Sequence, residues 1–241
     1  LQTVTRAPER RSPETPRSTG IDNFSPKLVP NFSFGTGPGA VYCQGVADGI
    51  TAREAKRLQT RERLLGAAIA EFKRAGKDES DVGAIVAAAG VAHGTFFFHF
   101  PTKEHVLLEL ERREEDRMAK RFATFTKTHH DLASALREAA HLVMGLERRL
   151  GVVLFKDFLA LHFSPTRPPA EHGDDHPLVV LVADQIDNAR QRGDTAADVT
   201  PMNSAIYFLL GLYALLITTD DSTGRRELVD DYLTRTLRSL Q

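Results

Sequence analysis

The sequence has a single cysteine, Cys43, so no disulfide can form within the chain. A disulfide-stapled secreted scaffold is therefore excluded, and the low cysteine content fits a reducing compartment. No apolar run reaches the roughly 18 residues that a membrane-spanning helix needs. The longest run, Ile206 to Ile217, is shorter and contains a glycine. No basic and then apolar leader opens the chain, so we expect a cytoplasmic protein with no membrane partner.

The usual signatures of catalysis are also missing. No glycine-rich phosphate loop follows a strand, no nucleophile elbow occurs, and no pair of carboxylates stands out as a catalytic dyad. Adjacent His129 and His130, and His172 and His176 four residues apart, are the nearest approach to a metal motif. The second pair lies in a loop rich in proline and glycine, and no cysteine joins either pair. We predict no enzymatic activity, no metal site and no bound cofactor.

Net charge is close to zero, at −1, and so it neither favours nor excludes a nucleic-acid partner. The charge is unevenly distributed, because residues 51–105 are slightly basic and residues 106–241 are slightly acidic. This asymmetry fits two regions with separate roles, or a chance scatter of solvated charges. The hydrophobic share of 41% is enough for a packed core.

The N-terminal segment, residues 1–48, differs from the rest because it is rich in proline, serine, threonine and glycine and has little periodicity. We expect it to be disordered or non-native, and we assign no chemistry to it. From Thr51 onward, apolar residues recur at three- and four-residue steps, which predicts helices. Capping residues such as Thr51 and Asp131, and glycines such as Gly76 and Gly151, delimit them. No alternating strand pattern occurs, so we predict an all-α protein of about nine helices.

Residues 80–100, "SDVGAIVAAAGVAHGTFFFHF", read as two short helices joined by a tight turn. Alanines 87–89 allow the helices to cross closely, Gly90 permits the sharp turn, and Val91 can fill the corner. This is a helix-turn-helix, whose second helix can enter a DNA major groove.

Residues 61–108 resemble the TetR family of transcriptional regulators. The resemblance rests on "RERLLGAAIAEFKRAG" followed by "DVGAIVAAAGVAHGTFFFHFPTKEHVLL". It implies a three-helix DNA-binding head over residues 49–101, joined to a helical ligand-binding and dimerisation domain over residues 102–241. It also implies a homodimer that binds a double-stranded DNA operator and a small-molecule effector.

The candidate DNA-contacting residues are the basic residues Arg53 and Arg57 at the start of the first helix and, on the face that the resemblance turns toward DNA, Asp81, Ala92, His93, Thr95, Phe97, Phe98, His99 and Lys103. Several of them depart from the family pattern, since Asp81, Ala92 and Phe97 lack the hydroxyl that family members usually aim at DNA. We expect Phe96 and Phe100 to fill the core of the head. Phe97 and Phe98 then either face DNA, where a ring can contact a thymine methyl group, or pack on the neighbouring helices.

In the rear domain the resemblance implies a pocket lined by bulky apolar residues and a few polar groups. The candidates are Phe122, Phe125, His141, Phe155, Phe158, His162, Asn203 and Tyr207. The last two helices carry apolar stripes that a lone surface helix would not tolerate, which predicts a dimer interface. Its candidates are Leu209, Leu212, Leu216, Val229, Leu233 and Leu237.

These observations favour a ligand-responsive regulator, a repressor released from its operator by a small apolar effector. The alternative is a helical ligand-binding or protein-interaction module whose head has a weakened or lost grip on DNA. The missing hydroxyl donors motivate that alternative.

Overall fold

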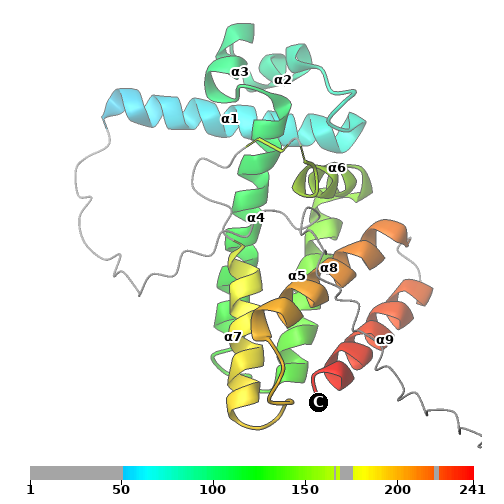
Figure 1. Cartoon of the computed structure of the whole chain (residues 1–241). Helices are drawn as coiled ribbons and strands as arrows, with labels where there is room; N and C mark the ends of the chain where they lie inside the picture. The colour runs from blue at the N-terminus through cyan, green and yellow to red at the C-terminus, as the bar shows by residue number, and fades with distance from the viewer. Residues whose placement is uncertain (1–50, 166, 169–175, 220–222) are drawn as a thin grey trace, which may run out of the picture. The chain divides into compact units, whose positions relative to one another are not determined.

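The computed structural model describes residues 51–165, 167–168, 176–219 and 223–241. The predicted N-terminal segment, residues 1–48, and His172 lie outside these residues. Within them the chain is all-helical, as the sequence predicts (Figure 1). The helices are α1 Ala52–Ala75, α2 Val82–Ala89, α3 His93–His99, α4 Lys103–Phe125, α5 Leu132–Leu150, α6 Val152–His162, α7 Pro177–Gln191, α8 Pro201–Thr218 and α9 Thr223–Ser239.

Local capping explains most helix ends. The Thr51 hydroxyl accepts a hydrogen bond from the amide of Glu54 at 3.2 Å and so begins α1. The Asp131 carboxylate accepts one from the amide of Ser134 at 2.7 Å and begins α5. Gly76 and Gly151, both at positive φ, end α1 and α5. Helix α4 begins differently, because the hydroxyl of Thr102 contacts the ring of His105 rather than a backbone amide.

Helices α1 to α3 form a compact group, called the head below. Helix α1 packs against α2, α2 against α3, and α1 also contacts α4 and α6. Helices α4 to α9 form the helical domain, in which α7 packs against α8, α4 and α5, and α8 packs against α9. Figure 1 shows α4 leading from the head into this domain. The buried apolar side chains form one continuous cluster across both groups, so the head has no separate core.

Helix α8 is apolar nearly all round. Among the described helices it alone is long and apolar enough, by length and composition, to cross a membrane. The core helix of a soluble domain meets the same test. Here α8 has neighbours on two sides, because it packs against α7 and α9.

Candidate nucleic-acid interface and ligand site

The two short helices of the predicted reading motif are present. Helix α2 begins at Asp81, whose carboxylate accepts hydrogen bonds from the amides of Gly83 at 2.9 Å and Ala84 at 3.2 Å. It ends at Gly90, in the left-handed conformation with φ 64° and ψ 44°. Helices α2 and α3 then make an angle of 95°. A residue with a Cβ would be strained at that turn, which is why a glycine stands there.

The four phenylalanines of residues 96–100 divide into two pairs. Phe96 and Phe100 are fully buried, which confirms the prediction that they fill the core of the head. Phe97 is 49% exposed and packs edge-on against Phe96, with ring centroids 5.3 Å apart. Phe98 is 74% exposed. An aromatic ring with that exposure contributes little to the fold, so the second pair is available to a partner.

Most of the other predicted DNA-contacting side chains lie at the surface. Ala92 and His93, at the start of α3, are exposed, and Thr95 is half-buried. Arg53 and Arg57 are exposed on the first two turns of α1, where Arg57 pairs with Glu54 at 2.6 Å.

Two of the predicted contact residues are engaged inside the head instead. His99 is buried, and burial lowers the pKa of its ring, with smaller effects in the same direction from Arg61 and Arg57. The Lys103 ammonium donates to the carbonyl oxygens of Lys77 at 2.9 Å, Asp78 at 3.0 Å and Ser80 at 2.7 Å. An ammonium has three N–H donors, so its donors are already used in tying the loop before α2 to the start of α4.

Arg61 has a similar internal role. Its Nη1 donates to the carbonyl of His99 at 2.5 Å, and its guanidinium lies 4.3 Å above the ring of Phe100. The carbonyl of His99 lies at the end of α3, where helix carbonyls lack intrahelical partners. Arg61 thereby fixes the end of α3 against α1, through a hydrogen bond and a cation–π contact.

The head is bound to the helical domain by several polar contacts. The backbone amide of Lys77 donates to Asp157 Oδ2, on α6, at 2.6 Å. Lys73 Nζ donates to the carbonyl of Arg149, at the end of α5, at 2.6 Å. Arg113 of α4 forms a bidentate ion pair with Glu62 of α1, with N–O distances of 2.7 and 2.5 Å. Through these contacts, a displacement of α4, α5 or α6 would act directly on the position of the head.

The predicted effector-pocket residues do not surround one cavity. Phe122, Phe155 and Phe158 are buried in the core, and Phe125 is half-buried with its ring stacked on His129. His162 is mostly buried against Glu111. The remaining three are exposed, with His141 on α5 and Asn203 and Tyr207 on α8.

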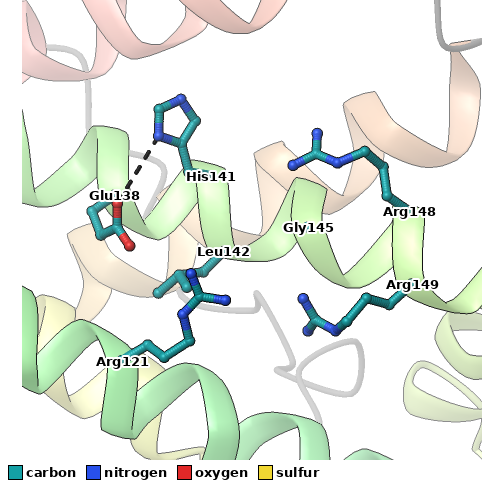
Figure 2. Close-up of a pocket in the computed structure, with 7 residues that line it drawn as sticks. All are labelled: Arg121, Glu138, His141, Leu142, Gly145, Arg148 and Arg149. Atoms are coloured by element: carbon teal, nitrogen blue, oxygen red, sulfur yellow. Dashed lines mark ion pairs between the residues drawn. The ribbon is translucent and has the colours of Figure 1, made fainter.

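A groove of about 450 Å³ does occur on the helical domain, beside α5 (Figure 2). It has the size of a small-molecule site. Figure 2 shows the guanidinium groups of Arg121, from α4, and Arg148 and Arg149, from α5, around Gly145. The other lining residues are Glu138, His141 and Leu142.

The groove has more positive charge than its own carboxylates neutralise. Arg149 pairs with Glu114 at 2.6 Å, yet its Nε is buried without a hydrogen-bond partner among the described residues. Arg121 and Arg148 are exposed and form no ion pair within the described part of the chain. A Cβ added at Gly145 would lie 3.3 Å from an Arg149 Nη1, so the glycine leaves room for that guanidinium. Arginine side chains in this arrangement suit a carboxylate or phosphate group.

The residues predicted for a dimer interface are already used within the chain. Leu209, Leu212, Leu216, Val229 and Leu233 are buried in a single protomer, and Leu237 is partly buried. The large apolar side chains that the described part of α8 and α9 leaves exposed are Tyr207, Ile217 and Leu228. A hollow of about 730 Å³ between the two helices is lined by Tyr207, Phe208, Gly211 and Tyr232 among others.

Sequence reasoning missed two groups of residues. One is the arginine set of the groove, which comes from two helices and has no motif of its own. The other consists of Glu111, Glu115, His162 and His176, which three helices bring together in the interior. Its only sequence signal is the spacing of the two glutamates, four residues apart on one helix face.

Comparison with known proteins agrees with the head and the fold. Residues 64–110 match the family model described as bacterial regulatory proteins, tetR family. No curated protein matches the chain.

Solved structures share the fold at low sequence identity. RolR in complex with resorcinol has a TM-score of 0.59 and 20% identity over 77% of this chain and 89% of its own. Thermus thermophilus FadR, a TetR-family repressor in complex with lauroyl-CoA, has a TM-score of 0.56 and 24% identity over 75% and 92%. The fatty acid degradation regulator FadR from Bacillus halodurans has a TM-score of 0.56 and 16% identity over 75% and 99%. The resemblance to the TetR family of bacterial regulatory proteins is thereby confirmed, by the family model in the head and by a shared fold over the helical domain.

Proposed function

We propose that this chain is a DNA-binding transcriptional regulator, a repressor whose affinity for its operator falls when a small molecule binds the helical domain. The observation that carries the proposal is the exposed face of α3, where Phe97 and Phe98 stand on a rigid helix-turn-helix. Phe96 and Phe100, which are fully buried, anchor that helix to the apolar core. A ring exposed on a reading helix can contact a thymine methyl group in the major groove.

The basic residues at the start of α1 would supply the contacts that do not depend on sequence. Arg53, Lys56 and Arg57 are exposed there. Contacts to phosphate give affinity and set the register of the protein on DNA, while contacts to bases give specificity. Because α3 has few polar donors, we expect this regulator to derive more of its affinity from α1 than from α3.

We further propose that the protein acts as a homodimer through the outward face of α8 and α9. The exposed apolar residues Tyr207, Ile217 and Leu228 support this face, whereas the leucines first predicted are turned into the protomer. Two heads on one dimer can read two half-sites at a fixed spacing, so a modest contact per head is sufficient.

For the effector we propose a small organic anion bound in the arginine groove. The aromatic residues first predicted to receive an apolar ligand are packed in the core, while the groove offers Arg121 and Arg148 without ion-pair partners among the described residues. RolR binds resorcinol and Thermus thermophilus FadR binds lauroyl-CoA. Because both share this fold, they support the proposal that the present chain also binds a small molecule.

The groove also has a direct connection to the head. Arg149 lines the groove, and its carbonyl accepts the hydrogen bond from Lys73 of α1. A ligand that draws the arginines together would favour a conformer in which the end of α5 moves relative to α1. A coupling free energy of about 1–3 kcal/mol would change operator affinity about 5- to 150-fold.

Selection of bound duplexes from random DNA by the full-length protein tests the DNA-binding role. We expect an enriched motif of two half-sites, and a mobility shift that Phe98→Ala weakens. If the protein binds duplex DNA without sequence preference, or binds no DNA even at low salt, the result would instead support a ligand-binding or protein-interaction module whose head has weak or no affinity for DNA.

The effector class is tested with benzoate and resorcinol as probes, which are small aromatic molecules of similar size, one anionic and one uncharged. We expect the anion to bind and Arg148→Ala to weaken that binding, while operator affinity without ligand is unchanged. Equal binding of both probes in wild type and Arg148→Ala would remove the groove from consideration.

A further inference from the structure

Four ionisable side chains meet inside the helical domain. Glu111 and Glu115 come from one face of α4, His162 is the last residue of α6, and His176 immediately precedes α7. Glu111, Glu115 and His176 are buried, and the His162 side chain is only 12% exposed. One donor atom each from Glu111, His162 and His176 can be chosen so that all three lie within 4.8 Å of one another.

The existing contacts leave this cluster incomplete. His162 Nδ1 lies 2.5 Å from Glu111 Oε1, and His176 Nδ1 lies 3.1 Å from Glu115 Oε1. The other oxygen of Glu115 is buried and has no hydrogen-bond partner among the described residues. Burying a carboxylate oxygen without a hydrogen-bond partner costs free energy. Such an atom therefore indicates that a bound partner is missing from the cluster.

Charge leads to the same conclusion. Two carboxylates four residues apart on a helix repel each other, and burial strengthens that repulsion. Arg167 pairs with Glu111 Oε2 at 3.1 Å, and Glu111 Oε1 faces the ring of His162. Glu115 is the carboxylate with an unused buried oxygen. A cation placed between Glu115 and the two rings would satisfy that oxygen and reduce the repulsion.

The donor set identifies the class of cation. Two imidazoles with carboxylates and no thiolate suit Zn²⁺ and similar divalent transition metals, whereas Mg²⁺ and Ca²⁺ prefer oxygen donors alone. Ligands bound at about 2.0–2.2 Å from one ion lie within about 4.4 Å of each other. The donors of Glu111, His162 and His176, which already lie within 4.8 Å of one another, therefore need only small side-chain rotations to close on an ion. Glu115 adjoins this group through its contact with His176 at 3.1 Å and would be the fourth ligand.

We propose that Glu111, Glu115, His162 and His176 bind one divalent transition-metal ion of the Zn²⁺ class. The ion would join α4, α6 and the start of α7 at a point where the described residues otherwise leave a buried carboxylate oxygen of Glu115 without a partner. The proposal concerns the helical domain alone and holds whether or not the head binds DNA.

The test uses the full-length protein, stripped with a chelator and then titrated with Zn²⁺ and, separately, Co²⁺. We expect one equivalent to bind, the melting temperature to rise with free Zn²⁺ as mass action requires, and Co²⁺ to give the visible absorption of a four-coordinate site. X-ray absorption at the zinc edge should show two imidazole ligands.

Two variants probe the ligands and one is a matched control. His162→Gln and Glu115→Gln keep the side-chain size, and each should weaken Zn²⁺ binding by at least about 10-fold, the lower end of what losing even an outer partner of a metal ligand costs. The double variant His129→Gln with His130→Gln removes the exposed histidine pair and should leave binding unchanged.

Three results would overturn the proposal. One is Zn²⁺ binding that is as tight in Glu115→Gln as in wild type, another is binding that the His129 and His130 control abolishes, and the third is no Zn²⁺-dependent rise in melting temperature. If His162→Gln does not fold, the imidazole count in the wild-type absorption spectrum decides, because one ring or none contradicts the site.

Discussion

The backbone amide of Lys77, in the head, donates a hydrogen bond of 2.6 Å to the carboxylate of Asp157, on α6 of the helical domain. Lys77 follows Gly76, whose positive φ turns the chain out of α1, so the amide is free of the helix and available to another element. A Cβ on Gly76 would lie 3.5 Å from Asp157 Oδ2, which shows how closely α6 approaches this turn. The head and α6 are therefore joined by a directional hydrogen bond as well as by apolar packing.

Replacing the acceptor should loosen this junction. We expect Asp157→Ala to lower the free energy of unfolding by about 1.5 kcal/mol, as for a hydrogen bond to a charged group, and to speed hydrogen exchange at the Lys77 amide. Asp157→Asn retains an acceptor oxygen and should lose less on both measures. Exchange at Lys77 that is equally slow in all three proteins would contradict the contact.

The two phenylalanine pairs should respond differently to truncation. Phe96→Ala or Phe100→Ala empties a fully buried aromatic site and should cost about 3–5 kcal/mol in urea denaturation. Phe98→Ala removes a ring that is 74% exposed and should change stability by less than about 0.5 kcal/mol. Its operator binding should weaken by about 1 kcal/mol, mainly at a thymine. If Phe98→Ala destabilises the head as much as Phe96→Ala, the exposed face of α3 has been misassigned.

Gly211 is required by the approach of Tyr232. An added Cβ would collide with the Tyr232 hydroxyl and lie 2.7 Å from its Cζ, while that hydroxyl donates to the carbonyl of Phe208 at 2.8 Å. We expect Gly211→Ala to separate α8 from α9 and lower the melting temperature. Gly66→Ala is the matched control, because its Cβ would meet nothing within 4 Å. Alanine there should stabilise α1 by up to about 1 kcal/mol. Similar effects of the two substitutions on melting would refute the packing argument.

Lys103 should behave as a structural residue. Lys103→Met removes the donor shared by three carbonyls and should cost about 1–3 kcal/mol of stability. Once corrected for the unfolded fraction, DNA affinity should keep the same dependence on salt. Arg53→Gln, on the exposed start of α1, should do the reverse and reduce the salt slope by about one. A reduced slope in Lys103→Met would return that residue to the DNA interface.

Glu104 should give the protein a measurable acid sensitivity. Burial disfavours its ionisation, but hydrogen bonds from Lys77 and Thr102 outweigh that effect and lower the pKa from 4.5 to about 2. The folded state thus favours the ionised form, and the resulting stability is complete above about pH 4.5 and is lost as the pH falls toward 2. Glu104→Gln should flatten the curve of unfolding free energy against pH within that window. An unchanged slope would show that other carboxylates control the acid transition.

Much of the local structure could be predicted because its causes are local. Thr51, Asp131 and the glycines that end α1, α2 and α5 act within a few residues, so the sequence alone located those helix ends. Thr102, at the start of α4, does not cap its helix in this way, because its hydroxyl contacts the ring of His105. The core pair of Phe96 and Phe100 was likewise predictable, since residues four apart share one helix face.

The function of several candidate residues could not be predicted, because it depends on partners far away in sequence. Lys103 has the charge expected of a phosphate contact, but three carbonyls from residues 77–80 take its donors. The leucines of α8 were expected to face a second protomer, yet they fill the space beside α7 and α9. An apolar stripe shows that a helix face must be covered, and it does not show by which neighbour.

The sequence by itself determined the helical class, the helix-turn-helix and the resemblance to the TetR family, since periodicity, capping and a contiguous motif are all short-range. Only the tertiary structure decided which side of each helix is buried, which arginines line a common groove, and that Glu111, Glu115, His162 and His176 meet. The reason is physical: these groupings join residues up to 65 positions apart in the sequence, and only the packing of α4 against α5, α6 and α7 brings them together.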